Sequence, residues 1–329
     1  MREMSAIVIS RHGGPEVLEH RRLAIPDATE GTAVVRVRAF GINHAEAYFR
    51  AGVWGEVARV SGIECAGEIV EPGPTGLAIG QRVVALMGGM GRTIHGSYAA
   101  YVRVPAHHVV AIESALPWTE LAALPESYAT AWVLLHDNLA CRAGDTLVIR
   151  GATSALGQAV VNLARELDVR VFGTTRSPGK RAVVEALGAE AVIDAPELAP
   201  GLRARIGAAD AVLDLVGVRT LLDSLRIARY GGRVAMAGFL GGGGPLAAFD
   251  PLTQLPSGVQ LSFFASAVAF GGEVPLSRIP FQQIVDDAAR GALRARPAHV
   301  FDFADIVAAH RLMESGGARG KIVVRGPDD

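Results

Sequence analysis

The chain has little cysteine and no long apolar run among its 329 residues. Its two cysteines, Cys65 and Cys141, lie far apart without a C-x-x-C spacing, which argues against a disulfide framework or a thiolate metal site and favours a reducing compartment. No stretch approaches about 18 uninterrupted apolar residues, and the opening MREMSAIVIS lacks the apolar core of a signal peptide. We therefore expect a soluble, cytoplasmic protein with no membrane partner.

Net charge is also almost absent. The 32 basic and 33 acidic side chains leave a formal charge of -1 at pH 7, so the chain has no broad field to gather polyanions or an anionic membrane. Nucleic acid is therefore not expected as a partner. Apolar residues, by contrast, make up 50% of the chain, which is enough for a large core. The length suggests two domains, at roughly 150 residues for each.

The rhythm of apolar runs changes along the chain. From Ser5 to Ile112, short alternating runs are broken by glycine and proline, a pattern typical of a compact, mostly antiparallel β domain. From about Leu121, strand-like runs alternate with helical runs, which predicts βαβ units wound around a parallel sheet. After Val268 the pattern breaks again. The closing strands are too few for a third domain, so we expect the tail to complete the first one.

The stretch GATSALG, Gly151 to Gly157, lies between the apolar run TLVIR and a helical run that begins at Gln158. A phosphate cradle needs a tight turn after a buried strand, exposed backbone N–H groups and a helix that begins where they point. Gly151 permits the turn, and Gly157 lets the helix approach the strand. Thr153 and Ser154 add hydroxyl groups between them. An ordinary strand-to-helix turn would also fit such a short pattern.

The next predicted strand distinguishes two forms of a dinucleotide cofactor. An NAD site usually carries an acidic residue there, which accepts hydrogen bonds from the ribose hydroxyls. The stretch VFGTTRSPGKR has no carboxylate, and instead it offers Thr175, Arg176, Ser177 and Lys180. Because a guanidinium pairs bidentately with a phosphate, this stretch favours the 2′-phosphate of NADPH over NADH. The alternative is that Arg176 and Lys180 are solvated charges at the start of a helix.

Several motifs follow one another over nearly the whole chain: GGPEVLE, GINHAEAYFRAG, SGIECAGEIVEPG, GQRVVAL, GSYAAYV, LPESYATAW, GATSALG, LGAEAVID, GGRVAMAG and GKIVV. Their order resembles the medium-chain dehydrogenase/reductase superfamily, in its zinc-independent, zeta-crystallin-like quinone oxidoreductase branch. The resemblance implies an α/β protein with a GroES-like β domain and a Rossmann domain built on a doubly wound parallel sheet. We expect the GroES-like domain at residues 1–120, completed by 267–329, and the NADPH-binding Rossmann domain at 121–266.

The positions that hold catalytic zinc in other members of this superfamily are altered here. Those members carry a Cys shortly after GI, a His before the Glu of a GHE motif, and a Cys or acid before the mid-chain helix. This chain has Asn43, Ile63 and Glu126 there, and it also lacks the cluster of structural cysteines. Isoleucine cannot bind a metal, so we predict no metal site. The alternative is a rebuilt site that uses His44, Glu46, Glu64 or Glu126.

The loss of the metal narrows the expected substrate class. Without a Lewis acid, the reduction of a simple ketone lacks its main stabilisation of the developing alkoxide. Quinones and conjugated enones spread the developing charge, so modest hydrogen-bond donors suffice. We predict NADPH-dependent reduction of a quinone or an α,β-unsaturated carbonyl by hydride transfer without a metal. The alternatives are a non-catalytic NADPH-binding scaffold or sensor, and a biosynthetic tailoring enoyl or enone reductase.

The resemblance also assigns catalytic candidates. Asn43 replaces the metal-binding Cys and is expected to face the nicotinamide and the substrate carbonyl. Tyr48 stands where quinone reductases often carry a Tyr, and Tyr128 and Thr130 are expected beneath the nicotinamide ring. The alternatives are that Tyr48 is a core aromatic and that Tyr128 packs between the domains. His44 would relay protons near pH 7 or serve a purely structural role.

The remaining cofactor contacts are implied by the resemblance and follow predicted strands. Gly217 and Gly238 would let the backbone approach the cofactor closely. The alternative is that these residues have only a structural role in a loop or in the core. The strand around LSFFASAV resembles the edge strand that pairs two Rossmann sheets across a dimer in this family. An exposed strand as apolar as this one would otherwise promote aggregation. We therefore expect a homodimer. The full set of these further contacts is Ala155, Leu156, Val216, Gly217, Gly238, Phe239, Leu240, Phe264, Ala265, Ser266 and Lys321.

Overall fold

The structure is a computed structural model that describes residues 2–328. The chain divides into two compact units. Unit 1 comprises the described residues up to Ala129 and from Ser266 onward, and unit 2 comprises Thr130–Ala265. The sequence prediction placed these divisions at 120/121 and 266/267. Residues preceding Ala129 group with unit 1 because helix α2 (Trp118–Leu121) packs on three strands of its sheet.

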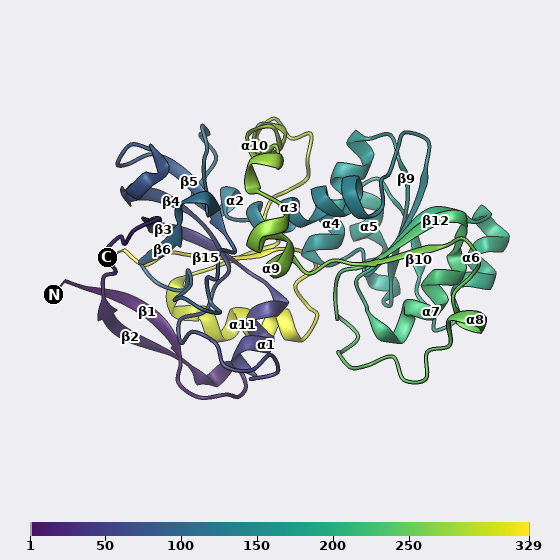
Figure 1. Ribbon diagram of the computed structural model, residues 1–329, viewed down its shortest axis with the longest axis horizontal. Helices are drawn as coiled ribbons and strands as arrows, with labels where there is room; N and C mark the ends of the chain where they lie inside the picture. Colours follow the sequence, from purple (N-terminus) through teal and green to yellow (C-terminus); the bar gives the residue numbers. More distant parts are fainter. Residues whose placement is uncertain (1, 329) are drawn as a thin grey trace. The chain divides into compact units, whose positions relative to one another are not determined.

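Unit 1 is built mainly on antiparallel strands. Strands β1 and β2 form a separate antiparallel pair, which Figure 1 shows as adjacent purple arrows. The larger sheet has seven strands in the order β14-β15-β3-β4-β5-β7, with β6 also paired to β3. The strands are β1 (Glu3–Ile9), β2 (Leu18–Ala24), β3 (Thr32–Ile42), β4 (Glu64–Glu71), β5 (Arg82–Leu86), β6 (Tyr101–Pro105), β7 (Val109–Ala111), β14 (His299–Phe301) and β15 (Ile322–Arg325).

The end of the chain completes the sheet of unit 1. Strand β15, yellow in Figure 1, pairs antiparallel with β3, and Ile322 lies opposite Ile42. Because one strand ends where the other begins, this register brings Asn43 beside Lys321. The two residues are 278 positions apart in the sequence. The closing strand thus supplies a charged side chain to a site that is otherwise built from the first part of the chain.

Short helices surround these strands. Helix α1 directly follows β3, so the residue that links them, Asn43, has an extended backbone with φ -128° and ψ 158° and caps the helix. The helices of unit 1 are α1 (His44–Arg50), α2, α9 (Ser266–Val268), α10 (Phe281–Ala289) and α11 (Ile306–Glu314), and α3 (Pro125–Val133) runs across the division. No helix within residues 2–328 is long and apolar enough to cross a membrane.

Unit 2 is a six-stranded parallel sheet in the order β10-β9-β8-β11-β12-β13. From β8 the chain adds β9 and then β10 on one side of the sheet. It then returns to the other side of β8, where it adds β11, β12 and β13. Helices cover both faces of this sheet, with α4 and α5 on one side and α7 on the other in Figure 1. Such a reversal marks the ligand-binding edge of an open α/β sheet.

The elements of unit 2 follow from their side chains. Strand β8, TLVIR, is buried from its second residue onward, as expected for a central parallel strand covered on both faces. Val148 and Phe172 meet Val212, Leu225 and Val234 in one apolar core. The elements are β8 (Thr146–Arg150), β9 (Arg170–Thr175), β10 (Glu190–Ile193), β11 (Ala209–Asp214), β12 (Ala228–Met236), β13 (Gln260–Phe263), α4 (Ala155–Glu166), α5 (Arg181–Ala186), α6 (Ala199–Ile206), α7 (Val218–Ile227) and α8 (Pro251–Gln254).

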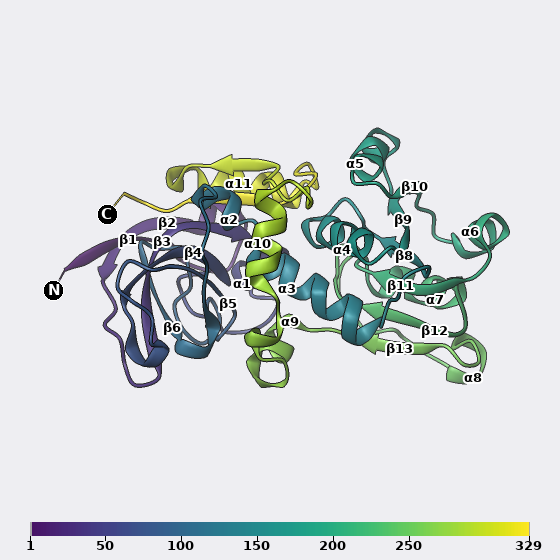
Figure 2. The same cartoon turned by 90° about the horizontal axis from the view of Figure 1, so that it is seen from above.

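Both parts of the predicted fold class are confirmed: a mainly antiparallel β unit and a doubly wound parallel α/β unit. The edge strand of unit 2, β13, is the outermost strand of its sheet in Figure 2 and pairs only with β12 among the described strands. Two of its apolar side chains remain open to solvent, Leu261 at 42% and Phe263 at 53% exposure.

Candidate functional site

The glycine loop follows β8 and leads directly into α4. Gly151 has a φ of 87°, a left-handed conformation that favours glycine. A Cβ on Gly157 would lie 2.7 Å from the Ala152 Cα and 2.7 Å from the Gly151 carbonyl oxygen. Both of these atoms belong to the backbone and cannot move aside as a side chain would. The two glycines therefore let α4 begin very close to the end of β8.

Ser154 closes the loop with its own hydroxyl group. Its Oγ donates to the Gly151 carbonyl at 2.9 Å and accepts from the Gly157 N–H at 3.1 Å, so it caps α4. The hydroxyl group that the sequence offered as a possible ligand contact is thus used within the loop, where it holds the turn and caps the helix.

Three backbone N–H groups at this helix start have no hydrogen-bond partner among the described residues: those of Thr153, Ala155 and Leu156. They stand at the positive end of the α4 dipole, where an anion is stabilised by the field and by direct hydrogen bonds. The residues present therefore fit a pyrophosphate group. The phosphate-binding role that the sequence predicts for the loop stays a prediction.

The predicted contacts after β11 and β12 lie next to the glycine loop. A Cβ on Gly151 would lie 3.1 Å from Leu240 Cδ1 and 3.9 Å from Val216 Cγ2. A Cβ on Gly217, whose φ is 101°, would lie 2.9 Å from the carbonyl oxygen of Gly238. The backbone at these strand ends is thus packed too closely to accept side chains at its glycines. The Phe239 ring lies 5.9 Å from that of Phe263, and the Phe264 N–H donates to the carbonyl of Met236, the last residue of β12.

Arg176 follows β9 and extends into solvent. Its side chain is exposed, and no hydrogen bond or ion pair holds it among the described residues. Ser177 is exposed beside it, and its N–H donates to the Thr175 hydroxyl at 3.3 Å. Lys180 is half-buried at the next turn. The end of β9 thus presents a guanidinium and no carboxylate to a ligand.

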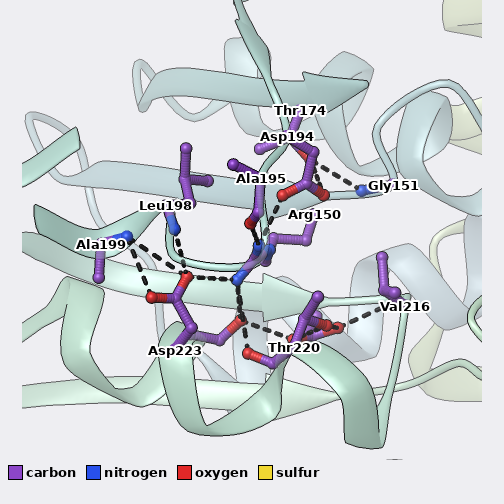
Figure 3. Close-up of polar contacts among 12 residues, drawn as sticks. Arg150, Gly151, Thr174, Asp194, Ala195, Leu198, Ala199, Val216, Thr220 and Asp223 are labelled. Carbon is purple, nitrogen blue, oxygen red and sulfur yellow. Dashed lines mark hydrogen bonds and ion pairs between the residues drawn. The ribbon is translucent and has the colours of Figure 1, made fainter. Parts of the chain in front are cut away.

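A buried ion network lies directly behind the glycine loop (Figure 3). Arg150, the last residue of β8, is 0% exposed and pairs with Asp194 at 2.6 Å and with Asp223 at 2.7 Å. Asp194 also accepts from the Thr174 hydroxyl at 3.1 Å, and that hydroxyl accepts from the Gly151 N–H at 3.2 Å. The sequence analysis did not identify this network. Its signal was a charged residue, Arg150, at the end of an otherwise apolar strand.

A second buried carboxylate supports the loop after β11. Asp214 is 0% exposed and accepts from the N–H groups of Val216 at 2.9 Å and Gly217 at 2.8 Å. The hydroxyl groups of Thr220 and Ser224 also donate hydrogen bonds to Asp214 Oδ2, at 2.8 Å and 2.6 Å. These donors, together with the start of α7, stabilise the negative charge of Asp214 in the core.

Unit 1 holds a polar cluster around Asn43. The amide Nδ2 donates to Glu64 Oε1 at 2.9 Å, and the amide Oδ1 accepts from Lys321 Nζ at 2.6 Å. Lys321 also forms an ion pair with Glu64, and its Nζ lies 3.4 Å from Ser127 Oγ. Gly41 leaves the necessary space, because a Cβ there would lie 2.4 Å from Glu64 Oε1 and 2.5 Å from Lys321 Cε. The Asn43 amide therefore already has protein partners at both ends.

Glu46 adds a carboxyl group to this cluster. It is 0% exposed and accepts from the Asn43 N–H at 2.7 Å and the Ile63 N–H at 3.2 Å. Burial raises the pKa of Glu46 to about 8, and the Glu64 charge adds to this rise while Lys321 opposes it. Burial, and then Lys321, also lowers the pKa of His44.

The tyrosines predicted to be catalytic both lie in unit 1. Tyr48, in α1, is half-buried, and its ring lies 4.9 Å from that of Trp54. Burial raises the pKa of Tyr48, so its hydroxyl keeps its proton at neutral pH and remains a hydrogen-bond donor. Tyr128, in α3, is 3% exposed. Ser266 and Lys321 also lie in unit 1, whereas Thr130, Ala265 and the other predicted cofactor contacts belong to unit 2.

The altered zinc positions do not form a cluster of metal ligands. Within residues 2–328, no group of three or more His, Cys, Asp or Glu side chains could hold a metal ion. Glu64 Oε2 instead accepts from the Glu126 N–H at 2.8 Å, and its Oε1 binds Lys321 and Asn43. The ammonium group of Lys321 thus balances the charge of the Glu64 carboxylate, with which it forms an ion pair.

Comparison with known proteins identifies the family. Residues 29–114 match the alcohol dehydrogenase GroES-like domain, and residues 187–324 match the zinc-binding dehydrogenase family model. A quinone oxidoreductase of Lama guanicoe is 28% identical over 98% of this chain and 98% of its own length. The chain belongs to the medium-chain dehydrogenase/reductase superfamily, in its quinone oxidoreductase branch. The predicted family is thereby confirmed.

Other members of this superfamily are similar along their whole length. A 2-haloacrylate reductase of a Burkholderia species is 28% identical over 97% of this chain and 98% of its own. A solved mycobacterial protein complexed with NADPH has a TM-score of 0.86 and 26% identity, covering 98% of this chain and 99% of its own. A solved NAD-dependent alcohol dehydrogenase has a TM-score of 0.82 and 28% identity, covering 98% and 100%. The family therefore establishes an oxidoreductase with a nicotinamide cofactor, and of these two solved proteins one is complexed with NADPH and the other is named as NAD-dependent.

Proposed function

We propose that this chain is an NADPH-dependent reductase of quinones or α,β-unsaturated carbonyls that acts without a metal. The observation that carries the proposal is the combination of free N–H groups at the start of α4 with Arg176 at the end of β9. The first feature suits a pyrophosphate and the second suits a 2′-phosphate. NADPH would supply the hydride, and the relatives named for quinone and 2-haloacrylate reduction act on conjugated acceptors.

The proposed roles in unit 1 follow from the hydrogen bonds of each residue. The Asn43 amide is held by Glu64 and Lys321, so we assign it to shaping the site beside the nicotinamide. Tyr48 is the better candidate for donating a hydrogen bond to the substrate carbonyl, because its side chain is half-buried and carries a hydroxyl group, whereas the Asn43 amide already donates to Glu64. Lys321 and Glu64 keep the cluster close to neutral charge. Tyr128 and Thr130 are proposed to support the nicotinamide ring.

Steady-state assays with NADPH and NADH against quinones, enals and simple alcohols test the proposal. We expect turnover with quinones or enals, a preference for NADPH, and no effect of a chelator. Equal rates with both cofactors would contradict the phosphate assignment, and turnover of alcohols alone with chelator sensitivity would contradict metal-free chemistry. The second candidate, an NADPH-binding scaffold, predicts binding of NADPH without turnover on this panel. A tailoring reductase predicts turnover only of a complex biosynthetic enone or enoyl thioester.

Arg176→Ala is expected to weaken NADPH binding selectively. Loss of one charge-assisted contact to a phosphate costs about 1.5 to 3 kcal/mol, or roughly 10- to 150-fold in Kd. Binding of NADH, which lacks the 2′-phosphate, should be nearly unaffected. Titration of cofactor fluorescence measures both constants. Arg181→Ala is the matched control, because Arg181 is also exposed and lies 3.7 Å from Glu185 on α5. Equal weakening of NADPH and NADH would show that Arg176 does not read the phosphate.

We also infer a homodimer formed through the edge of the unit 2 sheet. Leu261 and Phe263 leave an apolar surface on β13, and the strand has free backbone groups on its outer side because its described partner is β12 alone. An exposed edge of this kind promotes pairing with another chain.

A further inference from the structure

The loops proposed to hold the cofactor are joined to one chain of buried hydrogen bonds. We call Arg150, Asp194 and Thr174 the Arg150 relay, and it ends on the Gly151 N–H (Figure 3). Each member comes from a different strand end or the turn after it: β8, β10 and β9. The relay therefore links the carboxyl ends of three neighbouring strands behind the glycine loop.

The relay has a fixed direction. A hydroxyl group has one hydrogen to donate, and Thr174 Oγ1 donates it to Asp194 Oδ2 at 3.1 Å. The lone pairs of this oxygen are then directed to the Gly151 N–H, 3.2 Å away. The other carboxylate oxygen of Asp194 is held at 2.6 Å by Arg150, whose side chain is 0% exposed. The charge of Asp194 thus sets the orientation of the Thr174 hydroxyl, and the hydroxyl sets the direction of the Gly151 N–H.

Backbone hydrogen bonds tie the relay to both cofactor segments. The Ala152 N–H donates to the Thr174 carbonyl at 3.1 Å, and the Asp194 N–H donates to the Thr175 carbonyl at 3.0 Å. Thr175 directly precedes Arg176. A shift of the Asp194 carboxylate would therefore disturb the pyrophosphate loop and the strand end that carries Arg176.

Stability alone does not account for a charge pair at this depth. A buried ion pair is often no more stabilising than apolar residues of similar volume, because both charges lose their hydration. The Arg150 relay instead gives the loop a defined geometry. Its position behind the Thr153, Ala155 and Leu156 N–H groups points to a role in ligand binding.

We propose that Asp194 is a positioning residue for the cofactor: acting through Thr174, it fixes the turn at Gly151 and so aims the free N–H groups of the loop at the pyrophosphate. Asp194 does not touch the ligand itself. The proposal rests on the proposed function, since it takes the glycine loop to be the seat of NADPH.

The other end of β8 supplies a matched control. There the Thr146 N–H donates to Asp210 at 2.8 Å, and Asp210 pairs with Arg229 at 2.6 Å. This arrangement also joins a carboxylate, an arginine and a β8 backbone N–H, but it lies at the amino end of the strand. Asp210→Asn thus removes a similar interaction at a distance from the glycine loop.

Equilibrium binding of NADPH and NADH to the full chain tests the proposal. Thr174→Val and Asp194→Asn should each raise both Kd values by about 5- to 10-fold, because the pyrophosphate is common to the two cofactors. Thr174→Ser keeps the hydroxyl and should remain within about twofold of the wild type, as should Asp210→Asn. Where Asp194→Asn fails to fold, Thr174→Val retains both buried charges and carries the test.

A second readout needs no cofactor. Amide hydrogen exchange across residues 151–157 of the free protein should accelerate in Thr174→Val and stay unchanged in Asp210→Asn. Unchanged Kd values and exchange in Thr174→Val would overturn the proposal, as would equal weakening in Asp210→Asn. If the wild type binds neither cofactor, the proposed function fails, and exchange still shows whether the relay orders the loop.

Discussion

At the scale of single residues, small and buried polar side chains determine the geometry of both candidate sites. In unit 2, the glycines allow the close approach of α4 to β8, and Ser154 closes the turn. In unit 1, Asn43 stands where a metal ligand would be, yet its amide joins Glu64 to Lys321. Lys321 thus brings a positive charge into this cluster, and Asn43, Glu64 and Lys321 are linked to one another as a polar network.

Gly157→Ala is expected to impair both stability and cofactor binding. The new Cβ would lie 2.7 Å from backbone atoms on two sides, so α4 would have to move away from β8. Overpacking of this kind costs about 1 to 3 kcal/mol of unfolding free energy. Chemical denaturation and an NADPH titration measure the two effects.

The control for Gly157→Ala is Gly201→Ala in α6. A Cβ at Gly201 meets nothing within 4 Å, so this change should leave NADPH binding unaffected and stabilise the helix by up to about 1 kcal/mol. Wild-type stability and binding in Gly157→Ala would show that the loop has more room than the structure indicates.

At the scale of elements, helix α11 joins the last part of the chain to the start of unit 1. Its His310 is 0% exposed, and its Nε2 lies 3.0 Å from the Tyr98 hydroxyl. Glu314, one turn later, forms an ion pair with the buried Arg50 of α1. Burial, and then the Arg50 charge, lowers the pKa of His310 to about 3. The helix thus carries a neutral histidine into the core.

The stability of the protein should therefore fall in acid through His310. The folded state holds His310 neutral, whereas the unfolded chain protonates it below its ordinary pKa of 6.5. This contribution to stability is complete above pH 6.5 and is lost as the pH falls towards 3. Each pH unit in that window costs up to about 1.4 kcal/mol.

Denaturation of wild type and His310→Phe across this window measures the effect. The variant should be less stable at neutral pH, because Tyr98 loses its partner, and its stability should decline less steeply in acid. His12→Phe, at an exposed position, should keep the wild-type slope. Parallel curves for wild type and His310→Phe would contradict the assignment of acid sensitivity to His310.

At the scale of the whole molecule, the exposed edge of the unit 2 sheet determines the expected assembly. Leu261 and Phe263 on β13 are accompanied by Tyr230, which is 79% exposed on the neighbouring strand β12. Apolar groups beside an unpaired strand edge favour self-association. The two sheets of a homodimer would then continue across this edge.

Phe263→Asp should convert the proposed homodimer to a monomer. A carboxylate at the edge would have to lose its hydration in the interface, which opposes pairing. Light scattering coupled to size-exclusion chromatography gives the number of chains. Ile79→Asp is the control, since Ile79 is 74% exposed in a loop of unit 1. A wild type that is already monomeric, or a Phe263→Asp variant that stays dimeric, would rule out this edge as the interface.

The sequence by itself determined the fold class, the family and the place of the glycine loop, because these depend on local patterns. Alternating apolar runs, glycines at a strand end and the order of motifs are all legible along one chain. The absence of a carboxylate after β9 likewise follows from a single stretch. Arg150 and Asp214, by contrast, gave only a weak signal, as charged residues within apolar runs.

Only the tertiary structure decided which partners these polar residues have. Lys321 meets Asn43 because β15 returns antiparallel to β3, a pairing of segments 278 residues apart that no local pattern specifies. Asp194 reaches Arg150 because parallel strands align their carboxyl ends at one edge of the sheet. Long-range pairing converts scattered charges into the network behind the glycine loop, since burial compels each charge to find a partner.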